Sequence, residues 1–261
     1  MNARQDALEV FRTHYIAHRG LFDNASDHPE NTLAAFQRAV DAGFGVELDV
    51  HLTKDNQVVV AHDAGLDRIC GEDVLIRDLT YAQLQQRHVF TSTQTIPLFT
   101  DVLAVLGGKV PLVVEIKFDP RLDETCQRTD EILRTYDGPY CMESFDPRAL
   151  MWYRRNNPDV PRGQLSDDFA DDPGTSIEPV NWLLTNMMLN PWARPDFIAY
   201  RWPAVRRLGV RFWHRVLGCS MFAWTIQSQG QLDAARPYFD AFIFDSFVPA
   251  QIGTGLDADK R

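Results

Sequence analysis

Short apolar runs alternate with amphipathic segments along most of the chain. The apolar runs are rich in β-branched and aromatic residues and end at turn residues, as buried strands do. We expect strands at residues 14–20, 45–52, 111–118, 140–145, 162–167, 196–200, 221–226 and 241–247. Apolar positions at helical spacing predict helices over 121–136, 146–156, 176–189, 203–209 and 228–239. Such alternation implies parallel pairing, so the predicted fold class is α/β: a TIM (β/α)8 barrel rather than an open doubly wound sheet.

A further helix is expected directly after the first strand. Leu33, Phe36 and Val40 have helical spacing. Asn31 or Thr32 is a suitable N-cap, and Gly43 is suited to end the helix.

One strand breaks the alternation. Residues 57–63 (QVVVAHD) follow the second strand after Lys54-Asp55-Asn56, a gap too short for a crossover, so we expect an antiparallel hairpin. If Asp55-Asn56 is a two-residue loop, Asp49 lies opposite His62, whereas a bulge at Asn56 shifts the register by one and turns His62 away.

The hairpin opens an insertion between the second strand and the third barrel strand. We expect residues 1–261 to form a single barrel domain, with this insertion covering about 57–110. Within the insertion, Asp78 is expected to cap one short helix, and Thr100 or Asp101 another.

Composition narrows the class of protein. The chain is 45% hydrophobic and 11% aromatic, which excludes a disordered chain. Its net charge of −10 argues against a nucleic-acid binder but permits a small phosphorylated ligand. Because no CxxC pair, signal peptide or long apolar segment is found, we expect free thiols and a cytoplasmic protein without stable membrane insertion. The sequence leaves the oligomeric state open.

Two acids in the second strand are the first candidates for chemistry. Glu47 and Asp49 alternate with Val46, Leu48 and Val50, so both carboxylates lie on one face of the strand. They lie on an exposed edge, form structural salt bridges, or are ligands of a hard divalent cation such as Ca²⁺ or Mg²⁺.

Glu115 and Lys117 repeat the same spacing in a later strand. They form either a structural ion pair, or a third metal ligand and a phosphate contact. His18 and Arg19 end the first strand, and strand ends at the carboxyl mouth of a barrel carry catalytic groups. With His62, the set contains two histidines whose ordinary pKa suits acid–base catalysis near neutral pH.

These residues carry a family resemblance. Eight motifs occur in order along nearly the whole chain: HRG (18–20), PENT (29–32), ELDV (47–50), VVVAHD (58–63), EIK (115–117), SF (144–145), GQL (163–165) and AWTI (223–226). Together they resemble the glycerophosphodiester phosphodiesterase family, whose fold is a TIM barrel with a small insertion after the second strand.

The resemblance implies roles for particular residues. It implies that His18 and His62 are the acid–base pair, that a Ca²⁺ or Mg²⁺ ion is the cofactor, and that a glycerol hydroxyl attacks phosphorus before hydrolysis yields glycerol 3-phosphate and an alcohol. The implied metal ligands are Glu47, Asp49 and Glu115, and the implied substrate-binding residues are Arg19, Lys117 and Trp224.

Departures from the family pattern leave the substrate open. Gln227, Asn56 and Phe247 stand where the family often has Asn, Gly and Pro. One alternative is a phospholipase D-like hydrolase of lysophospholipid or sphingolipid, for which Phe22, Trp192, Trp202 and Trp213 are either an apolar lip or core. A second is a barrel that binds phosphoesters without turnover. The remaining histidines, His51 among them, are assigned to surface or packing roles.

Overall fold

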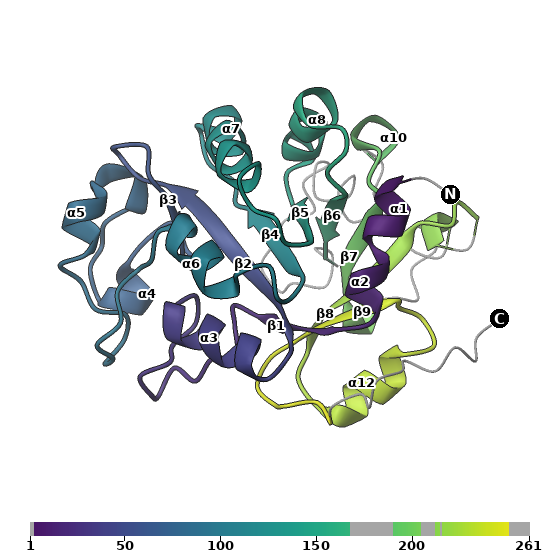
Figure 1. Cartoon of the computed structure of the whole chain (residues 1–261), viewed down its shortest axis with the longest axis horizontal. Coiled ribbons are helices and arrows are strands. Elements are labelled where there is room, and N and C mark those ends of the chain that lie inside the picture. Colours follow the sequence, from purple (N-terminus) through teal and green to yellow (C-terminus); the bar gives the residue numbers. More distant parts are fainter. Residues whose placement is uncertain (1–2, 168–189, 205–211, 215, 251–261) are drawn as a thin grey trace, which may run out of the picture. The chain divides into compact units, whose positions relative to one another are not determined.

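The computed structural model describes residues 3–167, 190–204, 212–214 and 216–250. All nine expected strands are found among them (Figure 1). They are β1 (Tyr15–His18), β2 (Gly45–Leu52), β3 (Val58–Val60), β4 (Leu112–Ile116), β5 (Tyr140–Ser144), β6 (Arg162–Ser166), β7 (Phe197–Arg201), β8 (Ser220–Ile226) and β9 (Ala241–Phe244).

The strand order is that of a (β/α)8 barrel. Hydrogen-bonded neighbours run β1-β9-β8-β7-β6-β5-β4-β2-β3, and β1 also pairs with β2. The pairs β2–β4, β6–β7, β7–β8 and β8–β9 are parallel, whereas β3 is antiparallel to β2. The predicted fold class is therefore confirmed, with β3 as the additional hairpin strand.

By its internal contacts the chain divides into two compact units, which we describe separately. One unit comprises residues 17–142, and the other comprises residues 1–16 and 143–261. The single domain over 1–261 stays a prediction.

In the 17–142 unit, helix α3 (Leu33–Asp41) packs against β2 and α6 (Phe99–Leu106). Its N-cap is Thr32, whose side chain accepts a hydrogen bond from the backbone N–H of Ala35, and Gly43 follows its end with a φ of +73°. Helix α7 (Leu122–Leu133) corresponds to the helix expected over 121–136 and contacts β2 and β3.

The hairpin register differs from the one expected from a two-residue loop. Val50 pairs with Val60 and Leu52 with Val58, and the Ala61 N–H donates to the Asp49 carbonyl, so Asp49 lies opposite Ala61 rather than His62. The loop contains three residues because Asn56 adopts a left-handed conformation with a φ of +60°, and the extra residue shifts the register by one.

The insertion has a hydrophobic core of its own. It contains α4 (Asp67–Cys70), the 3₁₀ helix η1 (Ile76–Asp78) and α5 (Tyr81–Leu84). These elements pack on a buried cluster formed by Val59, Ala61, Leu66, Ile69, Ile76, Leu79, Leu84, Val89 and Ile96. The insertion is therefore a folded element, because its apolar side chains are withdrawn from water.

Two expected helix caps are wrong. Helix α5 is capped by Thr80, which forms a capping box with Gln83, because Asp78 belongs to the preceding 3₁₀ helix. Helix α6 begins at Phe99 after Leu98, without a side-chain cap. Thr100 and Asp101 therefore lie inside its first turn.

The second unit contains α1 (Ala3–Ala7), α2 (Glu9–Arg12), α8 (Pro147–Asn156), α10 (Asn190–Ala193), η2 (Trp202–Ala204) and α12 (Gln229–Ala235). Helices α8 and α12 confirm the helices expected over 146–156 and 228–239. The expected helix 176–189 lies outside the described residues, as do residues 205–209 of the expected helix 203–209.

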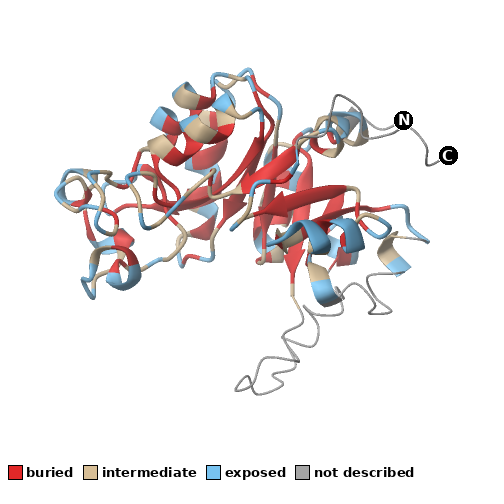
Figure 2. Ribbon diagram, turned by 90° about the horizontal axis from the view of Figure 1, so that it is seen from below, coloured by how far each residue is buried: buried red, intermediate tan, exposed pale blue. Residues whose placement is uncertain are grey.

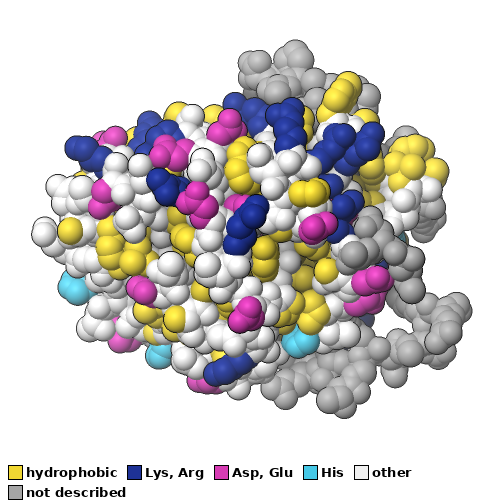
Figure 3. Space-filling model, turned by 45° about the horizontal axis from the view of Figure 1, so that its top comes forward, with side chains coloured by type: hydrophobic (Ala, Val, Ile, Leu, Met, Phe, Trp, Pro, Cys, Tyr) yellow, Lys and Arg dark blue, Asp and Glu magenta, His cyan; other side chains and the backbone are white. Residues whose placement is uncertain are grey.

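Burial follows the strands in both units. Strand residues are largely buried, whereas helices present exposed faces (Figure 2). Cys126, Cys141 and Cys219 are buried, Cys70 is half-buried, and all four are free thiols, as expected. Among the described ranges, no helix combines the length and apolar character needed to cross a membrane. Acidic, basic and hydrophobic side chains all occur on the face in Figure 3.

Candidate active site

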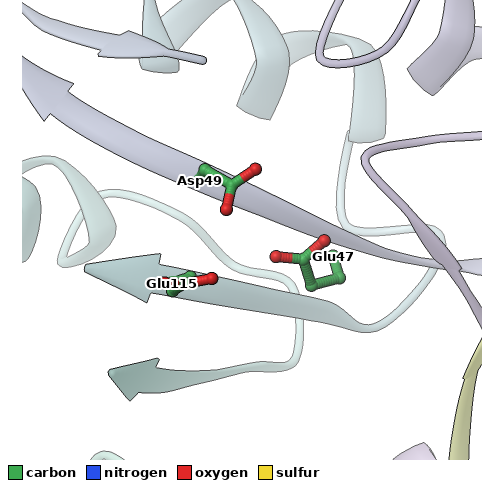
Figure 4. A group of neighbouring side chains, drawn as sticks. All are labelled: Glu47, Asp49 and Glu115. Atoms are coloured by element: carbon green, nitrogen blue, oxygen red, sulfur yellow. The ribbon is translucent and has the colours of Figure 1, made fainter. Parts of the chain in front are cut away.

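Three buried carboxylates converge in the 17–142 unit. Glu47 and Asp49 come from β2 and Glu115 comes from β4 (Figure 4). Each offers one carboxylate oxygen, and these oxygens all lie within 4.8 Å of one another. The convergence follows from the parallel register of β2 and β4, in which Asp49 pairs with Glu115 and Glu47 with Val113.

Lys117 lies between two of these carboxylates. Its Nζ is 2.7 Å from Asp49 Oδ1 and 2.8 Å from Glu115 Oε2. The neighbouring lysine lowers the pKa of Asp49 below its usual range even though burial opposes this, and the two acids raise the pKa of Lys117. A half-buried cation thus compensates part of the negative charge of the cluster.

The pKa of Glu115 moves in the opposite direction. Burial raises it to about 7, with a further contribution from the Asp49 charge, and the Lys117 ammonium only partly offsets this. Two carboxylates at adjacent register positions cannot both be ionised at low cost. An additional positive charge at this site would stabilise the ionised form of Glu115.

The turn after β1 places His18 and Arg19 beside the carboxylates. Arg19 and Gly20 both have left-handed φ values, +56° and +81°, a conformation that favours glycine. The Arg19 N–H donates to Glu47 Oε2 at 3.1 Å, and His18 Nε2 lies 3.8 Å from the same oxygen. The predicted site residues at the end of the first strand therefore do join the acidic cluster.

Residues of the PENT motif also reach the site, a role that their spacing in the sequence does not indicate. The Asn31 side chain donates to Asp49 Oδ2 at 2.8 Å. Glu30 accepts from Arg19 Nη1 at 2.9 Å and is buried. Thr32 and not Asn31 is the helix cap. The left-handed φ of +57° at Asn31 directs its amide into the site.

His62 follows β3 and interacts electrostatically with Asp49 and Lys117. Burial lowers its pKa to about 4 against the opposing attraction of Asp49, and the positive charges of Lys117 and Arg19 act in the same direction as burial. Its Nδ1 is 2.6 Å from Asp63 Oδ1, and its carbonyl oxygen is 3.1 Å from His51 Nε2. His51 is buried, in accord with the packing role assigned to it.

Trp224 belongs to the other unit. It lies in β8, and its ring meets that of Phe145 edge to face with centroids 5.7 Å apart. Of the four aromatic residues considered for an apolar lip, none is buried in the core: Trp192 is exposed, and Phe22, Trp202 and Trp213 are half-buried.

The donor set fits a hard divalent cation. Three converging carboxylates supply charged oxygen ligands, which Ca²⁺ and Mg²⁺ prefer. Seven of the eight predicted site residues lie in the 17–142 unit: His18, Arg19, Glu47, Asp49, His62, Glu115 and Lys117. This combination of acids, imidazoles and cations is suited to phosphoester chemistry.

Comparison with known proteins identifies the family. The model of the glycerophosphoryl diester phosphodiesterase family matches residues 18–245. The chain is 30% identical to a glycerophosphodiester phosphodiesterase of Bacillus altitudinis over 181 residues, which is 64% of this chain and 72% of that protein. It is 51% identical to lysophospholipase D GDPD1 of Mus musculus over 81 residues, but these cover 31% of this chain and 25% of that protein.

A solved structure shows the same fold. The glycerophosphodiester phosphodiesterase of Thermotoga maritima is 28% identical and superposes with a TM-score of 0.69, covering 90% of this chain and 95% of that one. Its similarity extends over both units and agrees with the strand order described above. The chain belongs to the glycerophosphoryl diester phosphodiesterase family and is a phosphoric diester hydrolase.

Proposed function

We propose that the chain hydrolyses glycerophosphodiesters to glycerol 3-phosphate and an alcohol, with a bound divalent cation and two histidines as acid and base. The observation that carries this proposal is the convergence of Glu47, Asp49 and Glu115 within 4.8 Å, in the same unit as both histidines. Family membership supports the substrate class.

The three carboxylates would hold the cation, Ca²⁺ or Mg²⁺. Such an ion would supply positive charge that offsets the negative charge of the phosphodiester. Lys117 would contact a non-bridging phosphate oxygen, for which its ammonium group is suited as a compact point charge. Arg19 would offer its planar guanidinium to a second phosphate oxygen.

The two histidines would move protons. His62 is suited to be the base, because Asp63 accepts from Nδ1 and leaves Nε2 as the acceptor in the neutral ring. It takes the proton from the glycerol hydroxyl next to the phosphate as that oxygen bonds to phosphorus. The bond from phosphorus to the leaving alcohol then breaks, and His18 gives that oxygen a proton. Water opens the cyclic phosphate with the two roles exchanged.

One proposed substrate-binding residue, Trp224, lies in the second unit. Trp224 is proposed to line the substrate pocket, as its position in the AWTI motif implies.

We also propose that the protein acts on small glycerophosphodiesters in the cytoplasm rather than on nucleic acid. An Oleispira antarctica phosphodiesterase of this fold was solved with the product sn-glycerol-3-phosphate, which agrees with the product proposed here.

Hydrolysis of lysophospholipids is a second candidate function. It is favoured by the 51% identity to a mouse lysophospholipase D over 81 residues and by 37% identity to the rat protein over 145 residues. The same site chemistry would serve, because only the group esterified to the glycerophosphate changes.

A substrate panel tests both candidates. Enzyme freed of metal with a chelator is titrated with Ca²⁺, Mg²⁺ or Mn²⁺ and given glycerophosphocholine or lysophosphatidylcholine. The proposal predicts metal-dependent release of glycerol 3-phosphate from the first substrate. Release of lysophosphatidic acid from the second substrate alone would instead support the lysophospholipase D function. Full activity in excess chelator would contradict the metal assignment.

A further inference from the structure

The Asp63 carboxylate is hydrogen-bonded to Nδ1 of the His62 ring. The two side chains meet at 2.6 Å, between His62 Nδ1 and Asp63 Oδ1. Burial by itself raises the pKa of Asp63, but its contacts with His62 and Arg68 outweigh burial and lower it. A carboxylate only accepts hydrogen bonds, so Nδ1 must carry the hydrogen. This contact sets the orientation of the ring and leaves Nε2 without a hydrogen when the ring is neutral.

One guanidinium group binds Asp63 and a second carboxylate of the site. Arg68 Nε donates to Asp63 Oδ2 at 2.5 Å, while its two terminal nitrogens donate to the two oxygens of Glu30 at 2.7 and 3.0 Å. Glu30 in turn accepts from Arg19 at 2.9 Å. Arg68 therefore connects the partner of His62 with the partner of Arg19.

Arg68 is supplied by the insertion. It lies in α4, next to Ile69 of the buried cluster, and its guanidinium carbon lies 5.8 Å from the centroid of the Phe90 ring. Because the insertion has its own hydrophobic core, it can fix the backbone from which Arg68 reaches Asp63 and Glu30.

We propose that Asp63 is a positioning residue for His62, and that Arg68 from the insertion fixes Asp63 and Glu30 together, so that the insertion aligns the base and the phosphate-binding arginine. This inference rests on the proposed function, which makes His62 the base and Arg19 a phosphate contact. The alternative is that Asp63–Arg68–Glu30 is a partly exposed ion-pair network that contributes only modestly to stability.

Asp63→Asn separates the two explanations. The carboxylate that stabilises the imidazolium is lost, so kcat should fall about 10- to 100-fold, as for other partners that orient an active imidazole, with KM changed less than about threefold. Glu72→Gln is the matched control, because Glu72 also pairs with an insertion arginine, Arg87, at 2.8 Å. The control should leave both constants unchanged.

A double-mutant cycle shows whether Asp63 acts through His62. If it does, the double variant His62→Gln with Asp63→Asn should have a kcat no more than about twofold below that of His62→Gln alone. Both substitutions would then remove the same function. Multiplying losses would overturn the proposal. Wild-type activity of His62→Gln would instead contradict the proposed function itself, which keeps the two failures distinct.

Arg68→Lys tests the connection made by the insertion. Lysine keeps the charge but cannot bind both carboxylates through a rigid fork. We expect kcat to fall and KM to rise, each about tenfold, whereas Arg87→Lys should change neither. A loss of thermal stability without any change in kcat or KM would overturn this part of the proposal.

The ring of His62 gives a readout that needs no turnover. In the folded protein without metal, ¹⁵N NMR should find the hydrogen on Nδ1 in the wild type and in Glu72→Gln. Asp63→Ala should move a substantial fraction of the hydrogen to Nε2. An unchanged hydrogen position in Asp63→Ala would overturn the positioning role, whatever the kinetics show.

Discussion

Asp49 and Glu115 occupy paired positions on the adjacent parallel strands β2 and β4. Their carboxylates are buried, face the same site, and share the ammonium group of Lys117 at 2.7 and 2.8 Å. The pair has one strongly acidic member and one whose pKa is raised to about 7. A divalent cation at this position would offset both the burial of the Glu115 charge and its repulsion by Asp49.

Metal binding should therefore compete with a proton on Glu115. Below pH 7 the ion must displace that proton, so the apparent affinity for Ca²⁺ or Mg²⁺ should weaken about tenfold per pH unit between pH 7 and the ordinary carboxyl range. Titration calorimetry at several pH values measures this slope. A matching slope in Glu115→Gln would show that another group is responsible.

The same group should affect the stability of the metal-free protein. Because the pKa of Glu115 is raised on folding, its contribution to stability is complete below its ordinary pKa and is lost as pH rises through about 7. The melting temperature in chelator should therefore include a decrease from about pH 5 to pH 8 that Glu115→Gln lacks. Saturating metal should diminish the decrease; a wild-type profile identical to that of the variant would refute this.

Glu47→Gln should keep the fold and weaken metal binding by at least about tenfold, because a neutral amide replaces a charged oxygen ligand. Glu131→Gln is the control, since Glu131 is exposed on α7. Direct titration of metal into each folded variant is the measurement. Wild-type affinity in Glu47→Gln would remove Glu47 from the ligand set.

Lys117→Met should impair both binding and turnover, because its charge acts on the substrate phosphate and on charge developing in the transition state. Lys109→Met, which removes an exposed lysine of the same unit, should have no effect. Steady-state kinetics at saturating metal decide the matter. A change below about threefold, under 1 kcal/mol, would mean that Lys117 is only an ion-pair partner of Asp49 and Glu115.

Gly20→Ala should destabilise the turn that carries His18 and Arg19. A Cβ at Gly20 would lie 2.9 Å from the backbone carbon of Ala35, in addition to the left-handed φ of +81°. Gly43→Ala has a similar φ of +73° and open space around it, so it should cost only the conformational penalty of about 1–2 kcal/mol. Urea unfolding should therefore give a larger loss for Gly20→Ala; equal losses would contradict the close approach.

Local periodicity was sufficient to predict the strands, whereas the set of three acidic ligands was implied by the family resemblance. The alternation of Glu47 and Asp49 with apolar residues places both carboxylates on one face of a strand, and a parallel barrel brings Glu115 beside them. Periodicity does not determine the hairpin register, because Asn56 permits either a two-residue or a three-residue loop. The structure has the three-residue loop, so Asp49 lies opposite Ala61, and the opposition of Asp49 and His62 expected for a two-residue loop is not found.

The contacts around the insertion required the tertiary structure. Arg68 and Glu30 are 38 positions apart in the sequence, and no spacing rule connects a short insertion helix with the PENT motif. Asn31 was similarly ambiguous, because an asparagine before a helix is usually a cap. Its left-handed backbone, which directs the amide to Asp49, has no local sequence signal distinct from capping.

The central claim is that one histidine is the base and the other is the acid. The direct test compares His18→Ala and His62→Ala on glycerophosphocholine and on the p-nitrophenyl ester of glycerol 3-phosphate, at saturating metal. On the natural substrate each variant should lose about 10²- to 10⁴-fold in kcat. Because p-nitrophenolate leaves without a proton, the ester should largely rescue His18→Ala and should not rescue His62→Ala. If the ester rescues neither variant and both lose metal affinity instead, the histidines are ligands and the account is contradicted.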